Sequence, residues 1–492
     1  MKVRLKQFFP KSAVKNESEN IIINGLSDDS RSVSKGDLFF IIERKNFDIY
    51  SILKNIEPKV AAFVGDVTSR EKIKSLLKYK PVIFVRGIKE HFRKACDLFY
   101  GFDKDGFKFI GITGTNGKTT TAYLTYYLLK KLGQKSALIS TVKYCTGSLR
   151  CKSSYTTPDI LTLRKFFQQA AKREADFVVM EVSSHAIDQE RIKGIIFSRC
   201  VFTNLTHEHL DYHKTMANYF IVKKRLFLNN KSSLAIINTD DIYGKKIFSK
   251  LSRKLSYGIK SAAMFRAEDI LINKAGSKFI LKINKKSYPV KTNLLGKHNI
   301  LNVLAAITTV YSLRIDIRKI VKAVSSFKTV KGRLERINRD IFVDYAHTPD
   351  ALERVLFTLK EVGYSKIICV FGCGGDRDKS KRPLMGKITS AQAYFTYITC
   401  DNPRSEDPKQ TCLEIEKGFK AKNYSVVLDR REAILKAIKL LEQNRLDNQG
   451  KRNICLLIAG KGHENYQIIG DRKLAFDDSR IVREIIKSRN NK

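Results

Sequence analysis

The chain lacks tryptophan and has few prolines and cysteines, 9 of each in 492 residues. An odd number of scattered cysteines, with no Cys-x-x-Cys pair, supports neither a disulfide framework nor a zinc site. No apolar run approaches the roughly 18 residues of a membrane span. The basic start, Met1–Pro10, also lacks the apolar stretch of a signal peptide. We therefore expect a cytoplasmic protein with reduced thiols and no membrane insertion.

Acidic residues are also scarce. The chain has 92 Lys and Arg against 49 Asp and Glu, a formal charge of +43. Taken alone, this excess suggests a nucleic-acid-dependent ATPase or another binder of polyanions. The basic residues are spread over the whole length, however, and no basic helix or aromatic RNA-binding signature accompanies them. We expect no nucleic-acid partner, and read the charge as a compositional bias that also attracts anionic substrates.

Apolar runs and helical patterns divide the chain into three blocks. Residues 1–104 indicate a small α/β unit, and residues 105–329 and 330–492 each alternate buried strands with helices, as parallel sheets do. Residues 251–295 alternate with a shorter period and predict a β appendage. The fold class is therefore α/β, with a small N-terminal domain, a central P-loop-type domain with a mostly parallel sheet, and a C-terminal Rossmann-like domain. Ligands of such blocks bind in the crevice between them.

A glycine-rich loop, Thr113–Thr119, lies between the apolar run Phe107–Ile112 and a helical pattern that ends at Gly133. Its glycines let backbone N–H groups approach phosphates, Lys118 adds a positive charge, and a threonine hydroxyl follows that can hold Mg²⁺. A strict P-loop would carry glycine where this chain has Ile112, so the loop is a variant. The pattern predicts that the protein uses ATP.

Two further segments offer metal ligands. Glu181 ends the apolar strand that begins at Phe177, and a carboxylate in that position near a P-loop is where a nucleotide-bound metal finds a second protein ligand. The segment Thr203–His213 contains three histidines and two acids within seven residues. Their spacing fits no zinc motif on a helix face, and no cysteine joins them. A single histidine that binds phosphate-bound Mg²⁺ fits this segment better.

These segments belong to a longer series of motifs that together resemble the Mur ligases, the ATP-dependent amide-forming enzymes of peptidoglycan precursor synthesis. The resemblance spans nearly the whole chain, in the correct order. Its last segments resemble the ligases that add a diamino acid to UDP-N-acetylmuramoyl-L-alanyl-D-glutamate. The matching segments are Thr113–Thr119, Glu181–His185, Thr203–His213, Leu295–Asn299 with Asn302, Gly332–Glu335, Asp344–Pro349, Phe371–Asp378, Lys381–Pro383, Asp401–Arg404 and Ala459–Glu464.

The resemblance implies a mechanism through an acyl phosphate. A substrate carboxylate attacks the γ-phosphoryl group of ATP, and an amine then displaces phosphate through a tetrahedral intermediate, so catalysis rests on positioning and charge neutralisation. Lys118, Lys223 and His209 are the implied catalytic residues. Lys223 is expected to be carbamylated by CO₂, which needs a neutral amine and therefore burial or nearby cations. The implied ligands of Mg²⁺ are Thr119, Glu181, His209 and the carbamate of Lys223.

The resemblance also implies one substrate for each block: the UDP substrate for residues 1–104, ATP for 105–329 and the amino acid for 330–492. The implied ATP contacts are Gly114, Thr115, Asn116, Gly117, Lys118, Thr119, Thr120, Asn302 and Arg333. The implied contacts of UDP-N-acetylmuramoyl dipeptide are Ser30, Thr156, Thr157, Ser183, Gln189 and Arg191. The implied contacts of the diamino acid are Arg382, Asp401, Asn402, Pro403, Arg404, Gly460 and Glu464.

The identity of the diamino acid depends on Arg404. Its guanidinium fork matches a carboxylate, so it favours meso-diaminopimelate over lysine or ornithine, which present an ammonium at that place. Glu464 suits the opposite task of pairing with an ammonium. The alternatives are the same ligase with lysine or ornithine and, more remotely, a ligase like folylpolyglutamate synthase, against which Gly372–Asp378 and Asp401–Pro408 argue. We expect a monomer whose third domain closes on ATP.

Overall fold

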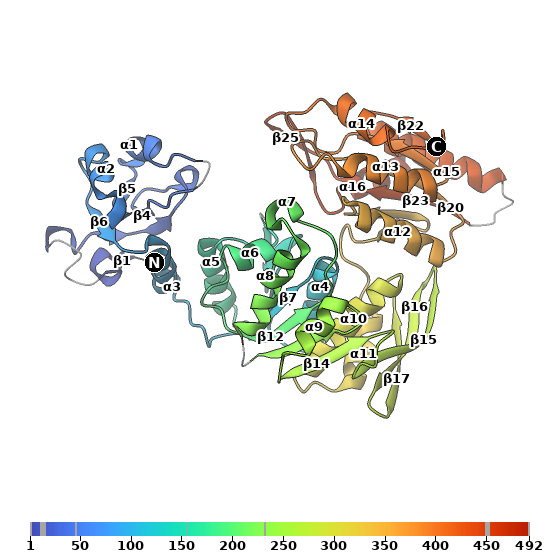
Figure 1. Ribbon diagram of the computed structural model, residues 1–492, viewed down its shortest axis with the longest axis horizontal. Coiled ribbons are helices and arrows are strands. Elements are labelled where there is room, and N and C mark those ends of the chain that lie inside the picture. The colour runs from blue at the N-terminus through green and yellow to red at the C-terminus, as the bar shows by residue number, and fades with distance from the viewer. Residues whose placement is uncertain are drawn as a thin grey trace.

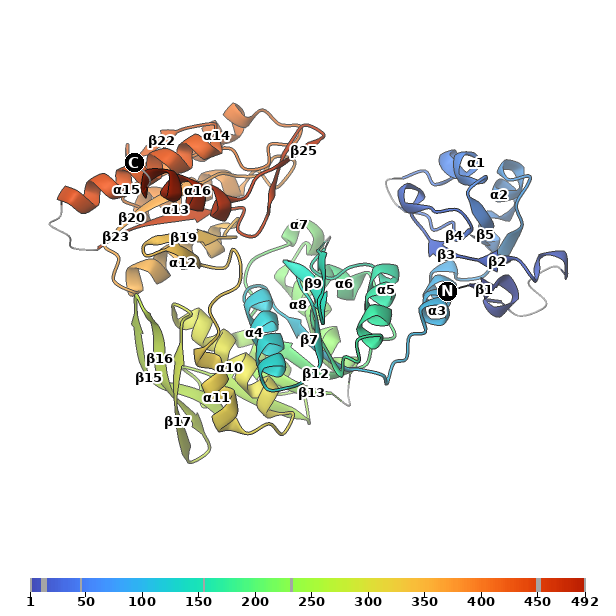
Figure 2. The same cartoon turned by 180° about the vertical axis from the view of Figure 1, so that it is seen from behind.

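A computed structural model describes residues 2–9, 16–44, 47–153, 155–230, 233–447 and 453–490. Three α/β units follow one another along the chain, each built around its own sheet (Figure 1), and the view from behind shows the same arrangement (Figure 2). In the described part of the chain, no helix is both long and apolar enough to cross a membrane.

The first unit is a four-stranded parallel sheet in the order β3-β4-β5-β6. Side chains of β4 alternate between its two faces, so Leu38 and Phe40 pack with α3 while Phe39 packs with α1 and α2. Both faces are thus covered, which explains why its strands read as continuous apolar runs. The elements are β1 Val3–Arg4, β2 Ile22–Ile23, β3 Gly25–Ser27, β4 Asp37–Phe40, β5 Val60–Asp66, β6 Val82–Val85, α1 Leu53–Ile56, α2 Arg70–Leu76 and α3 Ile88–Tyr100.

The second unit is an 11-stranded sheet in the order β10-β9-β8-β11-β7-β12-β13-β14-β15-β16-β17. It is parallel from β8 to β15 and antiparallel at both ends. The predicted β appendage therefore continues the main sheet through the β14–β15 pairing. The strands are β7 Lys108–Thr113, β8 Ser136–Ile139, β9 Lys143–Thr146, β10 Leu149–Lys152, β11 Phe177–Glu181, β12 Phe197–Phe202, β13 Leu234–Asn238, β14 Lys254–Gly258, β15 Phe265–Asn273, β16 Gly276–Ile283 and β17 Lys286–Thr292.

The helices of this unit cover both faces of the sheet. The helix α4 begins directly after the glycine-rich loop and packs against α10, and both contribute to one apolar cluster. It ends at Lys131, with Gly133 in the left-handed region at a φ of 80°, as the predicted C-cap requires. The helices are α4 Lys118–Lys131, α5 Ile160–Ala171, α6 Ser184–Asp188, α7 Leu210–His213, α8 Met216–Leu228, α9 Ile242–Phe248, α10 Lys297–Tyr311 and α11 Ile317–Ser325.

Strand register brings the predicted site segments to one edge of this sheet. The strands β11, β7 and β12 are parallel neighbours, with Glu181 opposite Ile112 and Phe202 opposite Thr113. Because parallel strands in register end together, Glu181, the glycine-rich loop and Thr203 meet at the carboxyl edge. This edge is where ligands bind in open α/β sheets.

The third unit is a six-stranded sheet in the order β18-β19-β23-β20-β21-β22, parallel except for β18. A separate hairpin, β24–β25, follows β23. The elements are β18 Glu335–Asn338, β19 Ile341–Asp344, β20 Lys366–Phe371, β21 Phe395–Ile398, β22 Tyr424–Val426, β23 Ile454–Ala459, β24 Tyr466–Ile469, β25 Arg472–Ala475, α12 Pro349–Glu361, α13 Lys381–Gln392, α14 Pro408–Glu416, α15 Arg430–Asp447 and α16 Asp478–Asn490.

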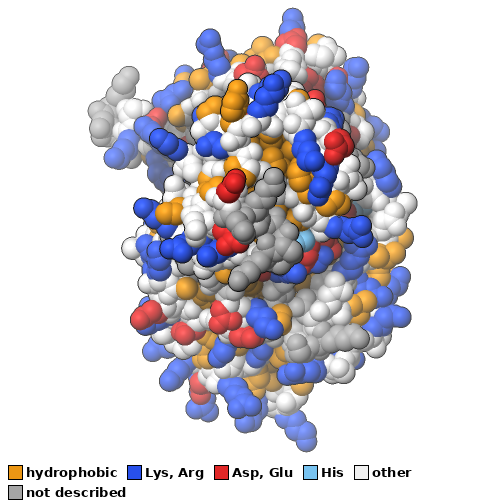
Figure 3. Space-filling model, turned by 90° about the vertical axis from the view of Figure 1, so that its left-hand side faces the viewer, with side chains coloured by type: hydrophobic (Ala, Val, Ile, Leu, Met, Phe, Trp, Pro, Cys, Tyr) orange, Lys and Arg blue, Asp and Glu red, His pale blue; other side chains and the backbone are white. Residues whose placement is uncertain are grey.

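Positive charge is spread over the one face of the molecule that the space-filling view shows (Figure 3). On the face that Figure 3 shows, Lys and Arg side chains are scattered and do not form one patch. A scattered distribution lacks the basic stripe by which proteins follow a nucleic-acid backbone.

Candidate active site

The glycine-rich loop is held tightly by its neighbours. Gly114 and Gly117 have φ values of 146° and 84°, and a Cβ on them would lie 1.9 Å from Thr203 Oγ1 and 2.2 Å from Asn302 Oδ1, respectively. Asn204 accepts the Asn116 N–H through its Oδ1 at 2.9 Å. Only glycine fits both the backbone conformation and the space. The loop therefore has a fixed shape with its N–H groups at the start of α4, as an anion site needs.

Lys118 lies over the loop that it follows. Its Nζ donates to the carbonyl oxygens of Gly114 at 3.0 Å and Thr115 at 2.6 Å. Burial lowers the pKa of this lysine, and the carboxylates of Glu208 and Glu181 oppose that shift. The ammonium thus sits at the mouth of the loop, held by weak acceptors that a phosphate can replace.

Thr119 and Glu181 form a pair of hard oxygen donors. The Thr119 hydroxyl donates to Glu181 Oε2 at 2.9 Å, and the other carboxylate oxygen accepts the Thr141 N–H at 2.8 Å. Two neighbouring ligands of an octahedral Mg²⁺, each about 2.1 Å from the metal, lie roughly 3 Å apart. Within the described ranges, no group of three or more His, Cys, Asp and Glu side chains is spaced to hold a metal by itself. The pair fits Mg²⁺ that also takes oxygens from a bound nucleotide.

Lys223 lies below the same loop, on α8. It is buried, and its Nζ donates to the Gly114 carbonyl at 2.8 Å. Burial first, and then the charge of Lys118, lowers its pKa well below the ordinary value. The neutral amine that carbamylation requires is therefore favoured here. The neighbouring Lys224 and Arg225 are less buried, and Arg225 pairs with Asp188 at 3.2 Å.

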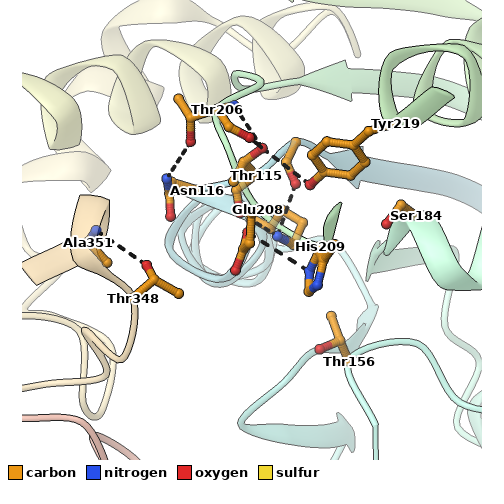
Figure 4. Close-up of polar contacts among 12 residues, drawn as sticks. Thr115, Asn116, Thr156, Ser184, Thr206, Glu208, His209, Tyr219, Thr348 and Ala351 are labelled. Atoms are coloured by element: carbon orange, nitrogen blue, oxygen red, sulfur yellow. Dashed lines mark hydrogen bonds and ion pairs between the residues drawn. The ribbon is translucent and has the colours of Figure 1, made fainter. Parts of the chain in front are cut away.

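His209 lies near enough to Lys118 and Lys223 to feel their charges, in a cluster of aromatic rings. Its residue is in the left-handed region at a φ of 57°, and its imidazole lies beside Glu208 and near Tyr219 (Figure 4). Burial and then Lys118 lower the pKa of His209 to about 3, so the ring is neutral at physiological pH and available as a ligand. The Tyr219 hydroxyl lies 3.2 Å from Thr115 Oγ1, which links the cluster to the loop.

Five of the six residues that the resemblance assigns to the muramoyl dipeptide form one polar network, and Ser30 is the exception. The Thr157 hydroxyl donates to the Glu181 carbonyl at 2.8 Å and accepts the Ser183 N–H at 3.0 Å. Arg191 donates to the Thr157 carbonyl at 2.9 Å, and also to Gln189 Oε1. Thr156 accepts from the Thr141 hydroxyl at 3.1 Å.

Ser30 lies apart from this network, in the first unit. It begins a short 3₁₀ helix, Ser30–Ser32, capped by the side chain of Asp29. Ser32 of this short helix lines a cavity together with Lys165 of α5. The Ser30 loop therefore lies near α5, the helix that follows Thr156 and Thr157 in the chain.

The central and third units enclose a cavity of about 350 Å³ above the glycine-rich loop. The Arg333 guanidinium donates to Thr119 Oγ1 at 3.2 Å and lies 4.6 Å from the centroid of the Tyr345 ring. Asp350 of α12 accepts from the Asn116 side chain at 3.0 Å. Asn302 Oδ1, on α10, accepts a hydrogen bond from the Thr121 hydroxyl at 3.3 Å. A nucleotide bound to the loop would thus touch both units.

The loops that follow β21 and β23 form a charged cluster on the third unit. Asn402 donates to Glu464 Oε2 at 3.0 Å, and Lys461, which is fully buried, donates to Asn402 Oδ1 at 3.0 Å. Burial raises the pKa of Glu464, and the charge of Lys461 opposes that shift. Gly460 has a φ of 108°, and a Cβ there would lie 2.8 Å from Asp401 Oδ2.

The two arginines assigned to the diamino acid differ in their surroundings. Arg404, after the buried Pro403, has a φ of 54° and is partly exposed, with its side chain donating to the Gly375 carbonyl. Arg382 is fully buried and pairs with Glu406 and Glu414, at 2.8 Å each. Arg404 is therefore accessible to a ligand in this structure, whereas Arg382 supports the loop beneath it.

Several residues at this site carried no predicted role. Asn204 and Tyr219 form hydrogen bonds to the glycine-rich loop, and the charge of Glu208 acts on Lys118. Lys461 pairs with the carboxylates of Asp401 and Glu464. His463 packs 4.9 Å from Tyr345, ring centroid to centroid, and so connects the third unit's charged cluster to Arg333. Except for Tyr219, these residues lie inside the predicted motifs, but which partners their side chains contact is decided by the fold.

Comparison with known proteins identifies the family of the chain. The family model described as "Mur ligase middle domain" matches residues 112–310, and that described as "Mur ligase, glutamate ligase domain" matches residues 332–476. A UDP-N-acetylmuramoyl-L-alanyl-D-glutamate--2,6-diaminopimelate ligase of Clostridium acetobutylicum is 39% identical over 475 residues, 95% of each chain. The protein of that name from Bacillus cereus is 36% identical over 485 residues, 96% of each chain.

Solved structures show the same relationship. A structure of a UDP-N-acetylmuramoyl-L-alanyl-D-glutamate--2,6-diaminopimelate ligase, 29% identical, superimposes with a TM-score of 0.66 over 100% of both chains. Folylpolyglutamate synthase of Mycobacterium tuberculosis complexed with ADP, 18% identical, has a TM-score of 0.61 over 75% of this chain and 91% of its own, and shares the fold alone.

The fold and the phosphate loop define a nucleotide-dependent α/β ligase. The chain belongs to the Mur ligase family, whose members are ATP-dependent ligases.

Proposed function

We propose that this enzyme joins meso-diaminopimelate to UDP-N-acetylmuramoyl-L-alanyl-D-glutamate at the expense of ATP, in peptidoglycan synthesis. One observation carries the proposal: the phosphate loop and Thr156 of the dipeptide network line one cavity together with Arg333 and Tyr345 of the third unit. Relatives that match 93% and 95% of the chain carry the name of this reaction. Residues 1–104, 105–329 and 330–492 would bind the UDP substrate, ATP and the diamino acid, respectively.

The first step transfers the γ-phosphoryl group to the glutamate carboxylate. The N–H groups of the loop hold the phosphates, and Lys118 exchanges its carbonyl acceptors for phosphate oxygens. Its positive charge offsets the repulsion between the glutamate carboxylate and the γ-phosphate. The remaining predicted ATP contacts, Thr120, Asn302 and Arg333, lie at the start of α4 and across the cavity. Mg²⁺ held by Thr119, Glu181 and His209 would supply further neutralisation of phosphate charge.

The second step forms the amide. The amine of the diamino acid attacks the acyl phosphate carbonyl, and phosphate leaves. Glu464 pairs with an ammonium of the diamino acid, and Arg404 pairs with its distal carboxylate. Asp401, Asn402 and Gly460 lie next to Glu464 and fix the shape of this binding site.

We further propose that Lys223 carries a carbamate. Its neutral amine would add CO₂ and lose a proton, which replaces a buried amine by an anionic oxygen ligand beside the metal. Intact-protein mass spectrometry at neutral pH, with and without added bicarbonate, should show the mass of one CO₂ on the wild type and not on Lys223→Met. Equal masses under both conditions, with full activity, would remove the carbamate from the proposal.

One experiment tests the reaction and the diamine together. Purified enzyme is incubated with UDP-N-acetylmuramoyl-L-alanyl-D-glutamate and ATP, and with diaminopimelate, lysine or ornithine in separate reactions. We expect ADP and a new amide product, identified by mass, that forms fastest with diaminopimelate. A product with lysine or ornithine alone would keep the ligase and change its substrate, and the absence of any product would refute the proposal.

A further inference from the structure

A buried arginine of the central unit connects the first unit to the substrate loops. Arg164 lies on α5, the helix that begins directly after the Thr156–Asp159 loop, and its side chain is fully buried. The helix α5 packs against α3 of the first unit. An arginine is almost never buried without a specific reason, because removing its charge from water is costly.

The contacts of Arg164 reach three separate segments. Its Nε donates to Asp97 Oδ1 of α3 at 2.6 Å, and its Nη2 donates to the Lys193 carbonyl at 3.3 Å. Its guanidinium carbon lies 3.7 Å from the ring centroid of Phe102, in the linker between the units. Arg93, also on α3, pairs with the second oxygen of Asp97.

The Lys193 carbonyl belongs to the turn that carries Gln189 and Arg191. At one end of this turn, Arg191 donates to the Thr157 carbonyl at 2.9 Å. At the other end, Gly194 has a φ of 83°, and a Cβ there would lie 3.1 Å from Arg93 Nη1 and 3.5 Å from Arg164 Nη2. The turn is thus packed closely against the two arginines.

Stability alone is a poor explanation for this arrangement. Arg164 Nη1 is buried and has no hydrogen-bond partner in the described residues, so the pairing is incomplete. A buried ion pair contributes little net stability, but its geometry is strict, because displacing one partner leaves an uncompensated charge. Rotating the first unit away from α5 would separate Asp97 from Arg164 and Phe102 from the guanidinium.

We infer that Arg164 is a positioning residue for the UDP substrate. It fixes the angle between the first unit and the central unit. At that angle the Ser30 loop binds the uridylyl end of the UDP substrate, and the Thr157–Arg191 network binds its dipeptide end. The inference rests on the proposed function, since both ends belong to the substrate named there. Its consequence is that Arg164 affects the substrate only through the uridylyl half.

The test compares the full substrate with a shortened one that lacks the uridylyl group, 1-phospho-N-acetylmuramoyl-L-alanyl-D-glutamate. The variants are Arg164→Met and Asp97→Asn, which keeps the shape of Asp97 if the first variant does not fold. Arg173→Met is the matched control, because Arg173 follows α5 and, among the described residues, its side chain hydrogen-bonds only Gln169 of that helix. KM and kcat are measured for both substrates and for ATP, with thermal unfolding in parallel.

For Arg164→Met and Asp97→Asn we expect KM for the full substrate to rise about tenfold, as follows if only about a tenth of the molecules hold the competent angle. The KM for ATP, kcat and the KM for the shortened substrate should stay at the wild-type values, as should every constant of Arg173→Met. An equal rise for both substrates, or no rise for either, would overturn the inference. Inactivity of the wild type would instead refute the proposed function.

Discussion

Two lysines at the phosphate loop illustrate how position decides the role of a residue. Lys118 and Lys223 both donate to the Gly114 carbonyl, at 3.0 and 2.8 Å. Lys118 lies at the open side of the loop and remains a candidate phosphate ligand. Lys223 lies beneath it, and burial together with the charge of Lys118 lowers its pKa. One lysine therefore offers charge and the other a neutral amine.

Replacing Lys118 by alanine should abolish product formation with every diamino acid. The loop keeps its backbone contacts to Asn204, so the fold should survive, but the γ-phosphoryl group loses its positive partner. Product is measured by mass spectrometry, with thermal unfolding as the control for folding. Activity within about tenfold of the wild type would contradict this role.

Replacing Arg404 by alanine should act selectively. Losing a charge-assisted hydrogen bond of roughly 1.5–3 kcal/mol should raise KM for diaminopimelate about ten- to a hundredfold or more. The KM values for lysine and ornithine should change much less, because neither offers a carboxylate at that place. Steady-state kinetics with the three amino acids, and with Arg404→Lys as the matched charge control, measures the difference. Equal losses for all three would refute the assignment.

At the scale of an element, α4 is defined by a glycine at each end. Gly117 and Gly133 have similar φ values of 84° and 80°, yet their surroundings differ. A Cβ at Gly117 would meet Asn302 Oδ1 at 2.2 Å, whereas at Gly133 nothing lies within 4 Å. Conformation alone explains the second glycine, and conformation together with close packing on α10 explains the first.

This difference predicts unequal effects of two alanine substitutions. Gly133→Ala should lower the free energy of unfolding by about 1 kcal/mol, the cost of a left-handed alanine, and leave KM for ATP unchanged. Gly117→Ala carries the same strain and also displaces Asn302 and the phosphate loop, so KM for ATP should rise at least about tenfold. Chemical denaturation and ATP kinetics on both variants check the pair. Similar ATP kinetics in the two would contradict the packing argument.

At the scale of the whole molecule, two histidines near the boundary between the central and third units should make stability depend on pH. His298 lies 3.3 Å from Thr358 of α12, and His463 packs against Tyr345. Burial lowers the pKa of His298 to about 4 and that of His463 to about 3. Both stay neutral in the folded chain, while the unfolded chain takes up protons near pH 6.5.

Because the unfolded state binds more protons below pH 6.5, stability is full above that pH and falls as the pH drops towards the folded-state pKa values. We expect a loss of about 1–2 kcal/mol for each histidine between pH 7 and pH 5. Thermal unfolding across this range measures it, and His298→Gln should flatten the curve. An unchanged midpoint from pH 7 to pH 5 would show that these rings are not buried as described.

Motifs that combine spacing with unusual residue types could be located from the sequence. The phosphate loop, the strand that ends in Glu181 and the Gly133 cap were all predicted, and the structure has them there. The β9–β10 hairpin was missed, although Gly147 and Ser148 between its strands are a turn signal. The edge strand β22, Tyr424–Val426, has no buried residue, so its apolar pattern is too weak to place it from the sequence.

The succession of α/β units, the phosphate loop and the family could be predicted from the sequence, because they depend on local pattern and on the order of motifs. Which side chains from distant segments meet depends on the fold. The burial of Lys223, the enclosure of Arg382 by Glu406 and Glu414, and the pairing of Arg164 with Asp97 join segments far apart in the chain. Such contacts depend on strand register and on how the units pack, and no local sequence pattern encodes either.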